Sequence, residues 1–385
     1  INERDGMEAG DRMLVRLAER LTKMVRGRDL IARLGGDTFA IAMTDLASRP
    51  EAMQRLENIR ARIERLNGEP RPETMSSGLV LVDPAVPGLS AADVLRDAEM
   101  AMRRAKVEGG RTVSFFDESI RNEVVERLQM TQDLQRAIER GDLTLHYQPQ
   151  FRLADGALSA VEALVRWHHP ERGMLPPGAF LPLAEEAGLI PALDAYVRSA
   201  AFAQLGTWIR RYPPASVPNI SVNLSPLEFA SEGIAEEIRA ELRRFHCPAD
   251  KVTIEILETA IVSAEAAELV QDLSNVGVNL AIDDFGTGYS SLAYLATLPV
   301  DHLKVDRSFV AQLDQNDERA RAVVAATISL GHELGLGITA EGVETAEQQA
   351  ALAELGCDYV QGYLRSMPVP AETIEAMIAE QIAAS

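Results

Sequence analysis

The sequence predicts an α/β protein whose larger part, residues 131–385, is a closed (β/α)8 barrel, preceded by a smaller α/β domain over residues 1–116. Two observations carry this prediction. Eight short apolar segments rich in β-branched residues follow one another from residue 143 onward, and helical stretches separate most of them. Strands that alternate with helices indicate a parallel sheet, and eight such units suit a closed barrel. An open, doubly wound sheet is the competing arrangement.

The elements of the barrel can be placed along the chain from their apolar patterns. The eight predicted strands are LTLHYQ, LSAVEALVRW, PNISVNLS, KVTIEILE, VNLAIDDFG, DHLKVD, LGITAEGVE and CDYVQGY. Helices are predicted between them over residues 193–211, 233–245, 264–275, 317–335 and 346–355.

The front region alternates helices and strands in the same way. Helices are predicted over residues 11–26, 51–66 and 90–106, a strand over 75–83, and two strands on either side of a tight turn at Gly35 and Gly36. A charged amphipathic stretch with few helix breakers follows over residues 117–140, and its first part, residues 117–130, is predicted to be a helical linker rather than a flexible one.

Composition narrows the class of protein. The 385 residues carry 38 basic and 58 acidic side chains, a net charge of −20, with 46% hydrophobic residues. This is globular composition, and the acidity excludes a broad basic face for duplex nucleic acid. The sequence contains no run of about eighteen apolar residues, so it predicts no membrane-spanning segment. Cys247 and Cys357 are too few for a disulfide framework, so we expect a reducing, cytoplasmic location. The chain begins at Ile1, and we interpret it as a piece of a longer protein that could be membrane-anchored upstream.

Polar residues interrupt the predicted strands, most of them near the carboxyl end of a strand. They are Glu162, Asn223, Glu255, Asp283, Asp284, Lys304, Glu341 and Gln361. Buried acids without partners are costly, and acids that converge on one barrel mouth repel one another, so divalent cations with oxygen ligands are the expected resolution. Such a set suits phosphodiester hydrolysis by two metal ions, with Lys304 orienting the nucleophile or stabilising charge in the transition state.

Each of these residues also has a plain structural explanation. Glu162 could lie on the surface, Asn223 could form a turn before Pro226, and the two aspartates could cap a helix. Lys304 could extend its amine to solvent, and Gln361 could simply precede a glycine turn. The recurrence of the pattern in successive strands favours the functional interpretation.

Several ordered motifs resemble the EAL domain, the cyclic di-GMP phosphodiesterase family, over about residues 127–380. They are YQPQ at 147–150, EALVRW at 162–167, PGAFLPLAEEAGLI at 177–190, NLSP at 223–226, EILET at 255–259, DDFGTGYSSL at 283–292, KVDRSFV at 304–310, AEGVET at 340–345 and QGYL at 361–364. The resemblance implies a TIM-like barrel that binds cyclic di-GMP and two Mg²⁺ or Mn²⁺ ions.

The resemblance also implies a role for each matching residue. Glu162, Asn223, Glu255 and Asp283 would bind one metal ion; Asp283 and Asp284, with Glu341 directly or through water, would face the second. Lys304 and Gln361 would position the attacking water, and either Lys304 or Glu341 would deprotonate it. Glu258 would hold the DDFGTGYSS loop, in which Gly286 and Gly288 allow close packing. Gln148, Arg166 and Asp306 would contact the substrate.

The front segment resembles a GGDEF domain, the diguanylate cyclase family, through RLGGDTF at 33–39 and AEMAMRRAK at 98–106. Thr38 replaces the signature Glu, and the start of that domain is absent from this chain, so we expect no GTP cyclisation. Gly35, Gly36 and Asp37 could still contact a guanine nucleotide such as GTP. Arg26 and Asp29 match the family's RxxD inhibitory site; a charge pair at a helix end is the alternative.

The leading prediction is therefore hydrolysis of cyclic di-GMP to linear pGpG, regulated by a partial, degenerate GGDEF domain. A receptor that binds cyclic di-GMP without hydrolysing it is the main alternative, and a bifunctional enzyme is a third possibility that Thr38 disfavours. The family resemblance further implies a homodimer.

Overall fold

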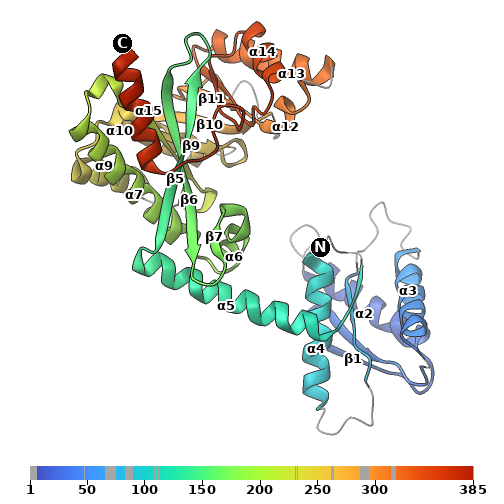
Figure 1. Ribbon diagram of the computed structural model, residues 1–385. Coiled ribbons are helices and arrows are strands. Elements are labelled where there is room, and N and C mark those ends of the chain that lie inside the picture. Colours follow the sequence, from blue (N-terminus) through green and yellow to red (C-terminus); the bar gives the residue numbers. More distant parts are fainter. Residues whose placement is uncertain are drawn as a thin grey trace. The chain divides into compact units, whose positions relative to one another are not determined.

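A computed structural model of the chain describes residues 7–46, 48–65, 75–82, 90–107, 110, 112–229, 231, 233–261, 264–286, 295–313 and 318–384 (Figure 1). The chain divides into two compact units, Ile1–Gln129 and Met130–Ser385. Each unit is described by itself. Among the described residues, no helix is both long and apolar enough to cross a membrane.

The described residues of the first unit form two small sheets and, before α5, three helices. Its elements are α2 (Met7–Met24), β1 (Leu30–Gly35), β2 (Thr38–Ala42), α3 (Arg49–Arg65), β3 (Ser77–Leu79), α4 (Ala91–Val107) and β4 (Val113–Phe115). Strands β1 and β2 pair antiparallel, and β3 pairs parallel with β4. The strand predicted over residues 75–83 is observed as the three-residue β3, and the three-residue β4 was not predicted.

Helix α5 (Glu118–Arg140) is continuous through the boundary between the units. It corresponds to the helical stretch predicted over residues 117–140, and the predicted linker, residues 117–130, is its first part. Its last turns supply Met130, Leu134 and Ala137 to a cluster of buried apolar residues in the second unit that also contains Trp167 and Phe180.

The second unit is a closed barrel of eight strands. They are β5 (Leu143–Arg152), β6 (Leu158–His169), β8 (Asn219–Leu224), β9 (Val252–Leu257), β10 (Asn279–Phe285), β11 (His302–Val305), β12 (Gly337–Ala340) and β13 (Tyr359–Val360). The order around the barrel is β5-β13-β12-β11-β10-β9-β8-β6, and pairing of β5 with β6 closes it, while β7 (Gly173–Leu175) adds to the outer edge of β6. The closed barrel, not the open sheet, is therefore the correct prediction.

One strand departs from the parallel arrangement that the alternation predicted. Strand β5 runs antiparallel to both of its neighbours, β6 and β13. The reason is local: only a short turn around Gly156, at φ 71°, connects β5 to β6. A parallel crossover needs a dozen or more residues, so this short connection forces a hairpin.

Helices cover the barrel and separate its strands. They are α6 (Leu181–Glu186), α7 (Ile190–Arg211), α8 (Pro226–Phe229), α9 (Ile234–Phe245), α10 (Ala264–Val276), α12 (Arg307–Val310), α13 (Glu318–Glu333), α14 (Ala346–Glu354) and α15 (Ala371–Ala384), with short 3-10 turns at Pro177–Ala179, Pro214–Ser216, Ala249–Lys251 and Glu258–Ala260. The five predicted helices correspond to α7, α9, α10, α13 and α14. The barrel core forms between strands and helices, with Trp208, Ile254 and Leu303 fully buried.

Candidate active site

The polar residues singled out in the barrel strands converge on one end of the barrel. Glu162 lies on β6, Asn223 on β8, Glu255 on β9, Asp283 and Asp284 on β10, and Lys304 on β11, while Glu341 and Gln361 directly follow β12 and β13. Each strand from β6 through β8 to β13 pairs parallel with the next one around the barrel, so the carboxyl ends of these strands meet at the same mouth. The carboxyl end is where barrel enzymes place their active sites.

Lys304 lies at the centre of this group and is fully buried, with its side chain 2% exposed. Its Nζ is 2.6 Å from Glu255 Oε2 and 2.6 Å from Glu341 Oε1. It also lies 3.2 Å from Asp283 Oδ1 and 3.9 Å from Glu162 Oε2. Burial by itself lowers the pKa of Lys304, but the surrounding carboxylates outweigh burial and raise that pKa well above its usual value. The amine is therefore held as an ammonium ion.

One ammonium ion does not balance the acids around it. Burial raises the pKa of Glu341 to about 7 and that of Asp284 to about 6, and neighbouring carboxylates add to both shifts. Burial also raises the pKa of Glu255 well above its usual value. Without a further cation, the site must retain protons near neutral pH. Asp284 shares a hydrogen bond with Asp306.

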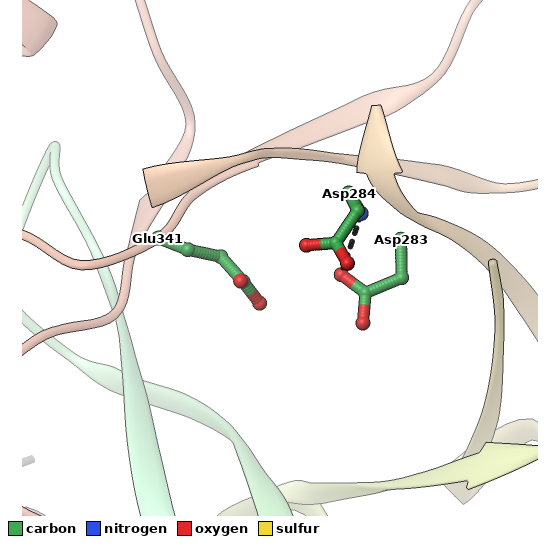
Figure 2. A group of neighbouring side chains, drawn as sticks. All are labelled: Asp283, Asp284 and Glu341. Atoms are coloured by element: carbon green, nitrogen blue, oxygen red, sulfur yellow. Dashed lines mark hydrogen bonds between the residues drawn. The ribbon is translucent and has the colours of Figure 1, made fainter. Parts of the chain in front are cut away.

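Asp283, Asp284 and Glu341 form a set of oxygen donors that could hold a metal ion. One carboxylate oxygen from each lies within 4.8 Å of the others. Figure 2 shows the three side chains directed toward a common space, with the Asp284 backbone N–H donating to Asp283 Oδ1 at 2.9 Å. Carboxylate oxygens suit Mg²⁺ and Mn²⁺, so the donor chemistry fits such an ion.

Two consecutive residues can face the same site only if the strand pattern is broken, because side chains alternate between the faces of a strand. The break occurs at Asp284, which has φ 54°, in the left-handed region. The pairing of β10 with β11 shifts register over the same residues, between Ile282 and Phe285. This irregularity turns both aspartates toward the mouth, and Asp tolerates left-handed backbone better than most residues.

Glu162 is held from two sides by amides. Asn223 Nδ2 donates to its Oε1 at 2.8 Å, and Gln361 Nε2 donates to its Oε2 at 2.5 Å. Gln361 Nε2 also donates to Gln148 Oε1 at 3.2 Å. Gln148 pairs with Glu162 in the β5–β6 register, which explains why the first strand contributes to the site although it runs in the opposite direction.

The predicted substrate contacts lie around this centre. Arg166, four residues after Glu162 on β6, is half-buried and donates from Nη1 to Val165 O at 2.8 Å. Asp306 caps α12 by accepting from Ser308 N at 2.9 Å. Burial favours the neutral form of Asp306, but the hydrogen bonds from Ser308 outweigh it and lower the pKa of that carboxyl below its usual value.

Glu258 lies in the 3-10 turn after β9 and is buried. Its Oε2 accepts from Gly286 N at 2.9 Å, at the start of the predicted glycine-rich loop. Gly286 has φ 100° and lies against the Phe309 ring, so a side chain there would be both strained and crowded. Gly288 and the rest of that loop lie outside the described residues.

The model of the EAL domain family matches residues 131–368, which include the whole of this site. The chain belongs to the EAL domain family. A second model, described as the diguanylate cyclase GGDEF domain, matches residues 1–112. Both resemblances in the sequence are thereby confirmed.

Curated relatives resemble both units of this EAL protein. A bifunctional diguanylate cyclase/cyclic di-GMP phosphodiesterase, MucR of Pseudomonas aeruginosa, is 39% identical over 382 residues, covering 98% of this chain and 55% of the relative. The cyclic di-GMP phosphodiesterase NbdA of the same organism is 36% identical over 383 residues, covering 98% and 48%. The chain thus spans about half the length of the curated relatives it matches.

Solved structures resemble the EAL barrel in particular. The structure described as PaMucR phosphodiesterase in complex with c-di-GMP is 42% identical, has a TM-score of 0.61, and covers 64% of this chain and 99% of that one. An EAL domain protein from Listeria monocytogenes EGD-e is 31% identical with a TM-score of 0.57, covering 64% and 96%. The barrel fold predicted for the family is therefore confirmed.

In the GGDEF unit, the residues of the signature turn lie at the β1–β2 connection. Gly35 and Gly36 have φ of 152° and 51°, and Arg33 closes the turn by donating from Nη2 to Gly36 O at 2.7 Å. Asp37 and Thr38 follow directly, and Thr38 begins β2. The structure therefore places the predicted nucleotide-contacting residues together on one turn.

Asp29 has a structural role in the same unit, and its side chain is 1% exposed. Its carboxylate accepts from Arg26 N at 2.8 Å and Thr44 N at 2.9 Å, and pairs with Arg55 at 2.5 Å. These contacts hold the Asp29 carboxylate within the fold, and its ion-pair partner is Arg55. An inhibitory site at Arg26 and Asp29 stays a prediction.

Proposed function

We propose that this EAL protein hydrolyses cyclic di-GMP to linear pGpG, using two divalent metal ions. The observation that carries the proposal is the complete set of acids around the buried Lys304, since each residue that the family motifs require for metal and water is present at one barrel mouth. Relatives and a solved structure named for cyclic di-GMP support the choice of substrate.

We assign the metal ligands from the donors that face the mouth. Glu162, Asn223, Glu255 and Asp283 would hold one ion, and Asp283 and Asp284, with Glu341, would hold the second. Mg²⁺ and Mn²⁺ are the cations that suit such oxygen donors. When bound, the ions neutralise the scissile phosphate and lower the pKa of a water molecule near it.

The residues of the chain supply the remaining parts of the reaction. Lys304, held as an ammonium ion, is suited to stabilise negative charge that develops on the phosphate, which favours Glu341 over Lys304 as the group that accepts the proton of the attacking water. Gln361 orients that water. Arg166 pairs with a phosphate of the substrate, because a guanidinium matches two phosphate oxygens. Gln148 and Asp306 line the nucleotide pocket.

The GGDEF unit is proposed to regulate the barrel rather than to cyclise GTP. Its turn carries Thr38 where the signature of that family has Glu. The purified chain is therefore expected to form no cyclic di-GMP from GTP, and GTP at Gly35, Gly36 and Asp37 is expected to change the rate of hydrolysis. A hydrolysis rate that is indifferent to GTP would remove the regulatory part of the proposal.

The test is an assay of the purified chain with Mn²⁺ and cyclic di-GMP, following linear pGpG by chromatography. The wild type is expected to turn over, and Glu162→Ala and Asp283→Asn are expected to abolish turnover because each removes a charged metal ligand. Absence of linear product at every metal concentration would contradict the proposed hydrolysis. Tight binding of unchanged cyclic di-GMP would then identify the chain as a receptor.

A further inference from the structure

Gln150 is a buried polar residue to which the sequence motifs assign no role. It lies on β5, two residues after Gln148, and its side chain is almost completely shielded from solvent. Its Nε2 donates to Gln361 Oε1 at 2.8 Å. Burying an amide costs free energy unless the amide is hydrogen-bonded. The hydrogen bond of Gln150 goes to the residue proposed to position the attacking water, and this suggests a role for it.

The strand geometry explains how Gln150 reaches the site. Side chains two apart on a strand share a face, so Gln148 and Gln150 both enter the barrel from β5. The antiparallel pairing of β5 with β13 places Arg152 opposite Tyr359 and Phe151 opposite Val360. Continued by one residue, that register would bring Gln150 opposite Gln361, in agreement with the hydrogen bond between their side chains.

The contacts of Gln361 define which way its amide faces. An amide has one acceptor oxygen and one NH₂ group with two donors. The NH₂ group of Gln361 donates to Glu162 Oε2 and Gln148 Oε1, and its carbonyl oxygen accepts from Gln150. Both ends of the buried amide are therefore occupied. Without Gln150, the carbonyl would lose this partner and the side chain would gain freedom to rotate away from Glu162.

We propose that Gln150 is a positioning residue for hydrolysis, acting through Gln361. It holds the Gln361 carbonyl from the β5 side, so that the NH₂ group stays directed at Glu162 and at the place of the attacking water. The inference rests on the proposed hydrolysis for its kinetic consequence. Partners that orient a catalytic group typically contribute about 10- to 100-fold to activity.

The kinetic test compares Gln150→Met with a matched control. Methionine has nearly the length of glutamine and cannot donate a hydrogen bond, so Gln150→Met is expected to lower kcat at least ~10-fold with little change in KM. Gln381→Met is the control, because Gln381 is a partly buried glutamine that hydrogen-bonds the backbone of Leu158, at the amino end of β6 and so at the end of that strand away from the candidate site. Its kcat is expected to stay at the wild-type value.

The double variant separates positioning from general damage to the fold. If Gln150 acts through Gln361, then Gln150→Met in a Gln361→Ala background should change kcat by less than about twofold. A full additional loss in that background, or a Gln150→Met enzyme as fast as wild type, would overturn the inference while leaving the proposed hydrolysis intact.

A readout that needs no activity is the side-chain amide resonance of Gln361 in ¹⁵N-labelled protein, assigned by its loss in Gln361→Ala. This resonance is expected to shift in Gln150→Met and to be unchanged in Gln381→Met. If the wild type does not hydrolyse cyclic di-GMP, the proposed function and the kinetic part of the inference fail together, and this resonance still decides whether Gln150 orients Gln361. An unshifted resonance in Gln150→Met contradicts it.

Discussion

At the scale of single residues, the site is a problem of charge. Four carboxylates lie within 4.0 Å of the one buried ammonium ion of Lys304, and a fifth acid, Asp284, adjoins them. Removing one partner of a buried ion pair strongly destabilises the folded protein, because the other charge is left uncompensated in the protein interior. Lys304 therefore has two separable effects, on the stability of the metal-free barrel and on the chemistry.

Replacing Lys304 by Met tests the effect on the chemistry and separates it from metal binding. We expect hydrolysis to fall by about 10²-fold or more, because one charge-stabilising donor is lost. Binding of Mn²⁺ is expected to persist, since the carboxylates released from Lys304 are free to bind the ion. Isothermal titration with Mn²⁺, beside the pGpG assay, checks this. Loss of Mn²⁺ binding together with turnover would show instead that Lys304 holds the ligand set in place.

At the scale of elements, helix α7 fixes the segment that carries Asn223. Arg198 of α7 is buried and pairs with Glu228 of α8, just after β8, and with Glu241 of α9 at 2.6 Å. Asp194, one turn earlier on the same helix, bonds Ser225 in the β8–α8 connection. Burial raises the pKa of Glu228 and outweighs the opposite effect of Arg198, so this carboxylate lies in a poorly solvated position. Two side chains on one face of α7 thus hold both ends of this short turn.

Arg198→Met is accordingly expected to cost about 3–5 kcal/mol of unfolding free energy, because it leaves a buried carboxylate unpaired. Arg211→Met is the matched control on the same helix. Its ion pair with Glu375 is solvent-exposed on the Arg211 side, where the side chain is 61% exposed, and such pairs contribute about 1 kcal/mol or less. Urea denaturation of both variants checks this, and equal losses would contradict the assigned role of Arg198.

The elements also show what the sequence could and could not predict. The strand positions and the polar residues near their carboxyl ends were predictable, because period and charge are properties of short segments. The reversed direction of β5 was not, since an apolar run looks the same in either direction and only the length of the connection around Gly156 hinted at a hairpin. Gln150 was missed because its function depends on a partner 211 residues away in the chain.

At the scale of the whole molecule, the two units have separate cores. One set of buried apolar residues gathers around Leu21, Ile59 and Ile63, and a much larger set fills the barrel. Metal ligands are proposed in the barrel alone. A ligand that binds one folded unit stabilises that unit by about 2.7 kcal/mol at 100 times its dissociation constant.

Scanning calorimetry is therefore expected to show two unfolding transitions, and Mn²⁺ is expected to raise the midpoint temperature of one of them. The raised pKa values give the pH dependence: Asp284 loses its proton around pH 6 and Glu341 loses its proton around pH 7, and protons compete with the metal. The increase in midpoint temperature that Mn²⁺ causes should hence be larger at pH 7.5 than at pH 5.5. Asp283→Asn should remove it, and a shift of equal size at both pH values would contradict the assigned ligands.

The reversed first strand has a consequence for how the chain enters the barrel. In an all-parallel barrel the first strand starts at the bottom, away from the reacting groups. Here β5 starts beside Trp167, near the carboxyl end of β6 and close to Arg166, because Leu143 pairs with Trp167. The last turns of α5 therefore arrive at the rim of the active site and pack on the strand that carries Glu162. A small displacement of that helix would therefore move residues at the rim of the candidate site directly, through its contacts with β6.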